Sequence, residues 1–378
     1  MSTKDHPSRF ERLQSIREAC SIDAFLFTSA PVIKWLSGYF YNFEIGPSPF
    51  HLLPAGLLVV PEHPLCLVIA DNEVLTEPVS VYEISVRPYA SYVYEKPLDF
   101  SNQFLSTLNE EIVQNHLTCS RIGIEKDSLP FSIAQSFTSR YPKIEFVDVT
   151  LEISKLRMVK DPDEIYAISQ AARLCDIGQA AVLKHAREGM TELELFSLVR
   201  NEMETAAGKR IPVMADVVCG SRTAEGGGNP SDKKIMHGEL ILSDLTPCLN
   251  GYWGDSCNTI VAGEPTILQR KTFTLVKEAL DIAVNSIHPG VKAFEIDRLM
   301  RRHIGNFPHH GGHGVGTMYH EEPRIVPYNE TELLPGMVVA LEPAVYHDGY
   351  GIRLEHLVVV TQTGCRILTG FSHKFEFI

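Results

Sequence analysis

Residues 239–263 read ELILSDLTPCLNGYWGDSCNTIVAG, and this stretch decides the fold of the second half of the chain. Two apolar runs with strand-like alternation flank the turn-like GYWG, which predicts a β-hairpin. Asp244 lies in the first run and Asp255 begins the second. A carboxylate on the inner face of a strand is costly unless it is paired or binds a metal. The hairpin therefore predicts a buried acidic site.

A second acidic pair repeats this pattern about a hundred residues later. Glu342 follows Asp244 by 98 residues, and Glu355 follows Asp255 by 100. The preceding segments align too, LKHAREGMTELELFSLV from residue 183 with NSIHPGVKAFEIDRLM from residue 285. We interpret the region as a duplicated helix-helix-hairpin unit, in which each copy supplies one carboxylate pair to a shared site. The alternative is four ordinary edge-strand acids that face water.

Residues 307–316, FPHHGGHGVG, are too rich in glycine for a helix, and these glycines permit close approach of the backbone. His313 in this segment, together with Glu342 and Glu355, suits a mixed nitrogen and oxygen site for Mn, Co, Zn or Fe. His320 is a candidate for a group that orients a metal ligand or stabilises an oxyanion. The alternative is a glycine loop whose histidines face solvent.

The rest of the chain predicts two domains, residues 1–154 and 155–378. Asp161-Pro162-Asp163-Glu164 is typical of a helix start, Gly189 is expected to end that helix, and Thr191 with Glu194 is expected to cap the next. The first 150 residues alternate helical stretches with β-rich runs, which indicates a small α/β domain. These runs are AFLFT, GLLVV, CLVIA, RIGIE and IEFVDV, with a turn-rich GYFYNFEIGPSPF after the first.

Composition excludes several classes of protein. The chain has 378 residues with 44% hydrophobic and 21% charged side chains, which is close to a globular average. A formal net charge of -13 argues against nucleic acid as a partner. No segment approaches 18 uninterrupted apolar residues and the N-terminus has no apolar signal region, so we expect no membrane span and a cytoplasmic protein. The eight cysteines form no CxxC pair, which weakly favours a reducing compartment.

At these residues the chain resembles the M24 metallopeptidase family, which has the pita-bread fold. Three motifs in the second half carry the resemblance, GHGVGTMYHEEP, VVALEPAVY and GIRLEHLVVVT. In the first half, DAFLFTSAPVIKWLSGYF resembles the N-terminal domain of the creatinase, prolidase and aminopeptidase P branch. The resemblance implies an α/β (α+β) chain, with a creatinase-like N-terminal domain before a pita-bread catalytic domain made of duplicated helix-hairpin halves.

The resemblance also implies roles for the site residues. Asp255 and Glu355 would bridge two divalent metal ions, Asp244 would hold one of them, and His313 with Glu342 would hold the other. In the hydrolases of the family a metal-bound water attacks the amide carbon, Glu342 would manage its proton, and His320 would steady the developing oxyanion.

Two further residues match substrate-binding positions of the proline-specific branch, namely His309 and Arg353. Arg353 shares a strand face with Glu355 by alternation, so we expect it to orient that carboxylate. Family peptidases also carry a histidine 17 or 18 residues before the first aspartate, where this chain has Gly227 or Gly226. His237 is too close to Asp244 to substitute for it, so the resemblance leaves peptide turnover in question.

These observations support a dinuclear metal-dependent hydrolase of the Xaa-Pro dipeptidase or aminopeptidase type, acting on a small peptide. An alternative is a hydrolase of the same fold that acts on a small non-peptide amide or cyclic C–N substrate, because Gly227 removes a bulky ring. A third is a binding module that kept the fold. A metal-free, creatinase-like route is disfavoured, since the surplus acids would repel one another. Family precedent favours a homodimer.

Overall fold

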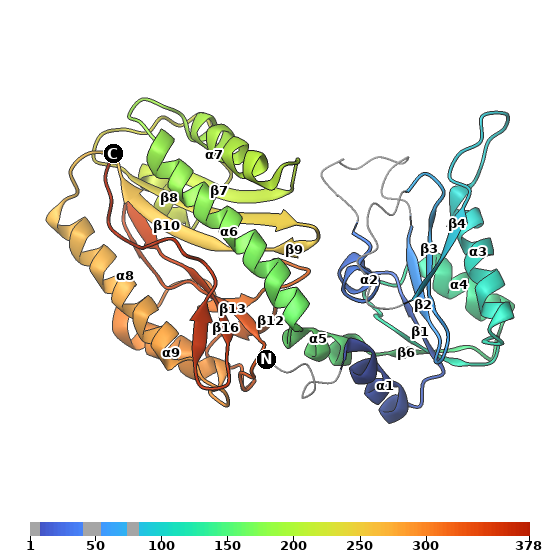
Figure 1. Ribbon diagram of the computed structural model, residues 1–378. Helices are drawn as coiled ribbons and strands as arrows, with labels where there is room; N and C mark the ends of the chain where they lie inside the picture. Colours follow the sequence, from blue (N-terminus) through green and yellow to red (C-terminus); the bar gives the residue numbers. More distant parts are fainter. Residues whose placement is uncertain (1–7, 41–53, 74–82) are drawn as a thin grey trace. The chain divides into compact units, whose positions relative to one another are not determined.

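The computed structural model describes residues 8–40, 54–73 and 83–378. The chain divides into two compact units, Met1–Leu156 and Arg157–Ile378, and both are drawn in Figure 1. From residue 41 onward, the turn-rich stretch GYFYNFEIGPSPF lies outside the described residues. Within the described ranges, no helix is long and apolar enough to cross a bilayer.

The first unit is built on one six-stranded sheet. Its strands are β1 (Ala24–Phe27), β2 (Gly56–Val59), β3 (Leu65–Ala70), β4 (Ile84–Tyr89), β5 (Arg121–Ile124) and β6 (Glu145–Asp148). Their order is β4-β3-β2-β1-β5-β6, with β1–β2 and β2–β3 antiparallel and the other neighbours parallel. The expected β-rich runs at 24–28, 56–60, 66–70, 121–125 and 144–149 thus all lie in strands.

Helices cover both faces of this sheet. They are α1 (Arg9–Cys20), α2 (Ala30–Ser37), α3 (Phe100–Gln114) and α4 (Phe131–Arg140). Phe25 and Phe27 belong to the core cluster of α1 and α2, whereas Leu26 between them belongs to the cluster of α3 and α4. Successive side chains of a strand point to opposite faces, so the continuous apolar run of β1 is explained by burial on both sides.

Helix starts in the second unit follow their capping signals. After α5 (Thr150–Met158), helix α6 (Pro162–His185) begins behind Asp161, whose capping box with Glu164 is formed. Helix α7 (Glu192–Ala207) begins behind Thr191, as expected. The end of α6 comes earlier than predicted, because Ala186 already has an extended backbone; Gly189 instead lies in the following turn with φ 81°.

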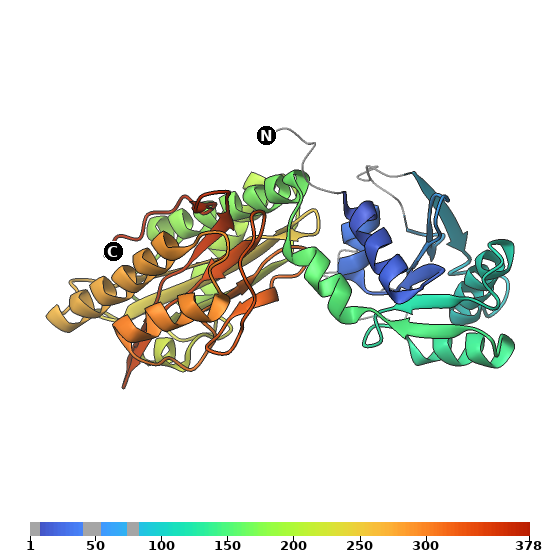
Figure 2. The same cartoon turned by 90° about the horizontal axis from the view of Figure 1, so that it is seen from below.

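The duplication is visible in the second unit as two helix pairs and two groups of strands. Helices α8 (Ile267–Ser286) and α9 (Ala293–Ile304) repeat α6 and α7, and Figures 1 and 2 show both pairs flanking the strands. The turns between the helices match in detail: the Gly189 amide donates to the Ile235 carbonyl at 2.8 Å, and the Gly290 amide donates to the Leu333 carbonyl at 2.9 Å. The expected duplicated helix-hairpin halves are confirmed.

The strands of the two halves differ in number. The first half has β7 (Val213–Cys219), β8 (Leu240–Leu249), β9 (Tyr252–Trp253) and β10 (Ser256–Val261), with β8 paired to β7, β9 and β10; the short helix η2 (Gly220–Glu225) follows β7. The second half has the order β12-β11-β13-β16-β17 and a separate β14–β15 hairpin. Its strands are β11 (Gly312–Gly314), β12 (Glu321–Ile325), β13 (Val338–Leu341), β14 (Ala344–His347), β15 (Tyr350–Arg353), β16 (His356–Val360) and β17 (Cys365–Ile367).

The two halves are joined where β10 runs beside the chain that leads from β15 to β16. The Glu355 amide donates to the Cys257 carbonyl at 2.9 Å. The Thr259 hydroxyl donates to the Arg353 carbonyl at 2.9 Å and accepts from the Arg353 amide at 3.2 Å. These bonds place the start of β10 beside the start of β16, which brings Asp255 and Glu355 to one place.

Candidate metal centre

Three of the expected ligands meet at this junction. Asp255 directly precedes β10, Glu355 directly precedes β16, and His313 is the middle residue of β11. One ligand atom of each lies within 4.8 Å of the others, and all three side chains are buried. The duplicated hairpins and the glycine-rich segment therefore do converge. The glycines of that segment allow the approach, because a Cβ on Gly312 would lie 2.0 Å from the Ala340 carbonyl oxygen.

His313 is oriented as a metal ligand would be. Its Nδ1–H donates to the Gly314 carbonyl at 3.0 Å, which leaves Nε2 unprotonated. Nε2 lies 3.6 Å from Asp255 Oδ2 and 3.5 Å from Glu342 Oε1. Burial lowers the pKa of His313 to about 4, so the ring is neutral near pH 7. A neutral imidazole whose free nitrogen faces carboxylates is the arrangement that a bound cation needs.

Asp244 is held by Arg353, which corrects one expectation. Arg353 Nη2 donates to Asp244 Oδ2 at 2.6 Å and to Asp216 Oδ2 at 3.4 Å, and no bond joins it to Glu355. Alternation along a single strand does not relate these two residues, because β15 ends at Arg353. Glu355 directly precedes β16, which belongs to another sheet. Burial raises the pKa of Asp244 to about 6, against the opposing effect of the Arg353 charge.

Asp255 and Glu355 are unfavourable as charged groups, whereas the neighbouring His310 and His313, against the effect of burial, lower the pKa of Glu342 to about 2. Burial, then the charges of neighbouring acids, raises the pKa of both Asp255 and Glu355 well above the ordinary value. Glu355 Oε1 is a buried oxygen that accepts no hydrogen bond from any described residue. Orphaned buried carboxylate oxygens are costly, and cations remove that cost. The donor set, rich in oxygen with one imidazole, fits divalent metal ions.

His309 and Arg353 belong to one hydrogen-bond chain. Arg353 Nη1 donates to the Tyr346 hydroxyl at 3.3 Å, and that hydroxyl lies 2.9 Å from His309 Nε2. His309 Nδ1–H in turn donates to the His310 carbonyl at 2.7 Å, so Nε2 accepts from Tyr346. Both nitrogens of His309 therefore have protein partners in the structure. The substrate contacts expected of His309 and Arg353 stay predictions.

Two site residues escaped the sequence reasoning. His310 Nε2 lies 2.9 Å from Glu342 Oε1, and the signal for it was a further histidine in the segment that already held His313. Asp216 in β7 pairs directly opposite Asp244 in β8. Its signal was an acid inside the apolar run VMADVVC.

Gly227 lies against Asp216. A Cβ at Gly227 would stand 1.9 Å from Asp216 Oδ2, and the glycine has φ 141°. The Gly226 carbonyl accepts from Arg353 Nη1, which ties this loop to the site. A side chain at this position would therefore have to displace the Asp216 carboxylate. His237 does not substitute for the histidine of family peptidases, since its Nδ1 lies 2.6 Å from Glu188 Oε1 on the surface.

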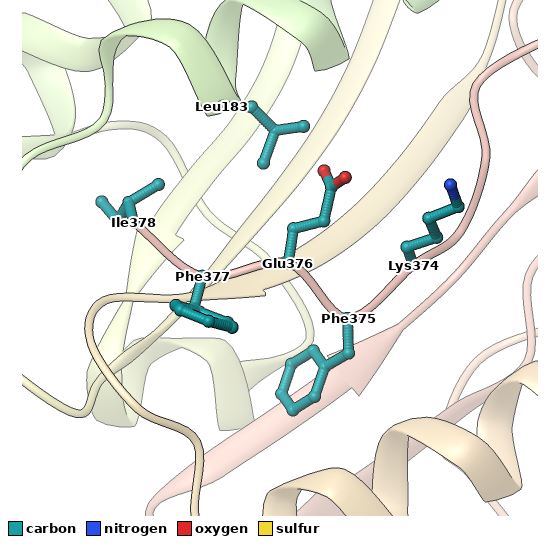
Figure 3. Close-up of a pocket in the computed structure, with 6 residues that line it drawn as sticks. All are labelled: Leu183, Lys374, Phe375, Glu376, Phe377 and Ile378. Atoms are coloured by element: carbon teal, nitrogen blue, oxygen red, sulfur yellow. The ribbon is translucent and has the colours of Figure 1, made fainter.

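His320 is the exposed member of the site. Its ring centroid lies 4.2 Å from that of His313, and neither of its nitrogens has a hydrogen-bond partner among the described residues. Burial and the neighbouring His310 lower its pKa. A cavity of about 510 Å³ elsewhere in this unit is lined by Leu183 and residues 374–378, and none of the predicted site residues lines it (Figure 3).

A duplicated unit that brings the buried Asp255, Glu342 and Glu355 and the partly buried Asp244 together with a histidine places the protein in the class of metal-dependent hydrolases. Comparison with known proteins agrees. The model of "Metallopeptidase family M24" matches residues 166–362, and that of the "Creatinase/Prolidase N-terminal domain" matches residues 9–159. The chain belongs to metallopeptidase family M24, in its prolidase and aminopeptidase P branch, and is a metal-dependent peptidase. The resemblance and the fold class expected from the sequence are confirmed.

Relatives in this branch are similar over most of their length. A Xaa-Pro dipeptidase of Pyrococcus furiosus is 35% identical over 266 residues, which cover 68% of this chain and 75% of the relative. The solved prolidase of Pyrococcus horikoshii is 27% identical with a TM-score of 0.81, covering 97% of this chain and 99% of that one. An X-Pro aminopeptidase of Thermotoga maritima is 26% identical with a TM-score of 0.81, at 97% and 99% coverage.

Proposed function

We propose that the protein is a dinuclear Xaa-Pro peptidase that cleaves the amide bond before proline in dipeptides or short peptides. The observation that carries this proposal is the meeting of Asp255 and Glu355, one acid from each duplicated half, with His313. Asp255 and Glu355 would hold both ions, Asp244 would complete one site, and His313 with Glu342 would complete the other. Divalent ions at these positions supply Lewis acidity to a water molecule and to the scissile carbonyl.

The protein residues around these ligands divide the remaining work. Glu342 would accept the proton of the attacking water, since its Oε1 lies 3.5 Å from His313 Nε2 within the ligand group. His320 would donate to the developing oxyanion, because its ring nitrogens are free. Arg353 is buried with its guanidinium bonded to protein groups, which favours a role in holding Asp244 over direct contact with substrate.

Metal removal and a substrate panel test this proposal together. Protein treated with a chelator is expected to lose hydrolysis of Xaa-Pro dipeptides, and re-addition of Mn, Co, Zn or Fe should restore it with two ions per chain by elemental analysis. A panel of matched Xaa-Ala dipeptides is the control for proline preference. If the metal-loaded protein leaves every Xaa-Pro substrate uncut, the proposal is wrong.

A second candidate function rests on Gly227 and Asp216. The branch's histidine is missing there and a carboxylate takes its place, so the pocket wall differs in both shape and charge. A small non-peptide amide or a cyclic C–N compound is the substrate class for this candidate. Hydrolysis of such compounds, without turnover of the Xaa-Pro panel, would favour it over the peptidase proposal.

The expected homodimer and the cytoplasmic location stay predictions. Light scattering at several protein concentrations measures the first, and fractionation of the source cells measures the second.

A further inference from the structure

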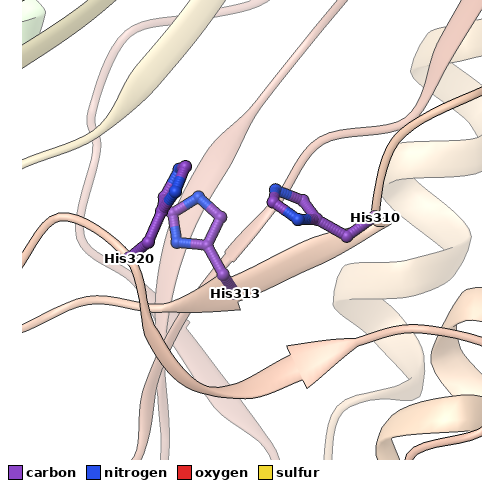
Figure 4. A group of neighbouring side chains, drawn as sticks. All are labelled: His310, His313 and His320. Carbon is purple, nitrogen blue, oxygen red and sulfur yellow. The ribbon is translucent and has the colours of Figure 1, made fainter. Parts of the chain in front are cut away.

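Three histidine rings converge beside the carboxylate centre. His310, His313 and His320 each offer a ring nitrogen, and these atoms lie within 4.8 Å of one another. The ring centroids are 5.1 Å apart for His310 and His313, and 4.2 Å apart for His313 and His320. Figure 4 shows the His313 ring between those of His320 and His310. Their spacing is that of ligands that surround a single ion.

A carboxylate oxygen completes this group. Glu342 Oε1 lies 2.9 Å from His310 Nε2 and 3.5 Å from His313 Nε2. This oxygen is buried, and its partner at 2.9 Å is the His310 ring itself. Glu342 Oε1 thus lies at the same place as the imidazole nitrogens.

We propose that His310, His313, His320 and Glu342 form a second kind of metal site, for one transition ion of the zinc or cobalt class. Three imidazoles with one carboxylate suit Zn²⁺ or Co²⁺ in a low coordination number. Mn²⁺ and Mg²⁺ favour the oxygen-rich ligands Asp244, Asp255 and Glu355 instead. This inference goes beyond the proposed peptidase function, because it concerns a binding mode that does not depend on the substrate.

The histidine site and the complete carboxylate centre cannot be occupied at the same time. His313 has a single free nitrogen, since Nδ1–H is bonded to the Gly314 carbonyl. An ion that takes His313 Nε2 and Glu342 Oε1 withdraws both from the carboxylate centre. The zinc-class ion therefore acts as an inhibitor that competes with the second ion of the active centre.

His310 is the residue that distinguishes the two modes, and His310→Asn tests the proposal. Chelator-treated protein is titrated with Co²⁺, followed by its visible absorption, and then with Zn²⁺ in competition. The native protein is expected to show the intense absorption of low-coordinate Co²⁺ with nitrogen ligands. His310→Asn should lose it and bind Zn²⁺ at least about tenfold more weakly, since loss of supporting groups alone costs metal sites about 10–100-fold.

His288→Asn is the matched control, because the ring of that exposed histidine lies 2.9 Å from the Pro289 carbonyl, outside the site. It should bind both ions as the native protein does. Identical Co²⁺ spectra and Zn²⁺ affinities for the native and His310→Asn proteins would overturn the proposal. X-ray absorption of the Zn²⁺-loaded native protein gives an independent answer if the variant fails to fold: fewer than three imidazoles on the ion rejects the site.

An activity measurement links the histidine site to catalysis. Protein loaded with Mn²⁺ is expected to lose activity as Zn²⁺ is added beyond two equivalents, and His310→Asn should resist this loss. The binding arms need no substrate, so their outcome is separate from that of the peptidase proposal.

Discussion

At the scale of single residues, Gly227 and Asp216 act as one unit. The backbone at Gly227 has φ 141°, where a side chain is strained by about 1–3 kcal/mol, and a Cβ there would meet Asp216 Oδ2 at 1.9 Å. Each of these residues therefore restricts what the other position can hold.

Gly227→His alone is expected to destabilise the protein and to lower activity on any substrate. Asp216→Ala combined with Gly227→His should recover part of the stability, since the clash is removed while the backbone strain remains. Urea unfolding measures the free energy, and kcat/KM on the substrate panel measures activity. Gly189→His serves as the control, because Gly189 also has positive φ but no atom lies within 4 Å of its Cβ position. Equal stability of the single and double variants would contradict the coupling.

The residues that the sequence failed to identify share a physical cause. Asp255, Glu355 and His313 could be predicted from the sequence, because strand alternation and repeat spacing are properties of one strand or one repeat. Asp216 reaches the site through its register across β7 and β8, which a single sequence does not encode. Arg353 was assigned to the wrong carboxylate for the same reason, since its partner Asp244 is 109 residues away.

At the scale of elements, the loop that carries His320 is anchored by a buried ion cluster. Glu321 lies 3.0 Å from Lys160 Nζ, pairs with Arg157, and accepts from the Met318 amide at 3.0 Å. All these groups lie in the second unit, and the side chain of Glu321 is 7% exposed. The segment before α6 thereby fixes the position of the loop.

Glu321→Gln is expected to destabilise the protein by about 3–5 kcal/mol at pH 7, since it removes the carboxylate that pairs with the buried Lys160 and the partly buried Arg157. Burial opposes ionisation of Glu321, but the charges of Arg157 and Lys160 prevail and lower its pKa below the model-peptide value of 4.5. A lowered folded pKa means that this stabilisation is complete above about pH 4.5 and is lost as pH falls through the folded value. The difference between native and variant proteins should therefore shrink in acid.

Urea midpoints at pH 7, 5 and 4 measure this difference. Glu322→Gln is the control, because its exposed carboxylate pairs with Arg324 on the surface. A gap between native and Glu321→Gln proteins that stays constant down to pH 4 would show that the charge of Glu321 contributes little.

Several helices and strands could be predicted from local sequence signals. The starts of α6 and α7 and the strands around the two hairpins were all predicted, because capping boxes and apolar alternation are local properties. The β14–β15 hairpin was not predicted by itself, although its two-residue turn, Asp348-Gly349, is a typical hairpin signal. Its importance comes from Tyr346 and Arg353, which it places beside Asp244 through contacts between sheets.

At the scale of the whole second unit, Thr259 joins the two halves. Its buried hydroxyl is bonded to both the amide and the carbonyl of Arg353. Thr259→Val keeps the shape but removes the hydroxyl bonds to both backbone groups of Arg353, so a loss of about 1–3 kcal/mol in the free energy of unfolding is expected. Thr274→Val removes an exposed helical hydroxyl and should change little. Urea unfolding compares the two, and equal losses would contradict a special role for the junction.

The duplicated halves share a backbone arrangement but carry different side chains at matching positions. His313 in β11 pairs with Ala340, two residues before Glu342, and the matching place in the first half is Val218, which pairs with Leu242, two residues before Asp244. One half therefore contributes an imidazole where the other contributes a valine. Two ions held between such halves would be inequivalent, each exchanging with solution at its own rate, and an internally repeated protein would act through an asymmetric centre.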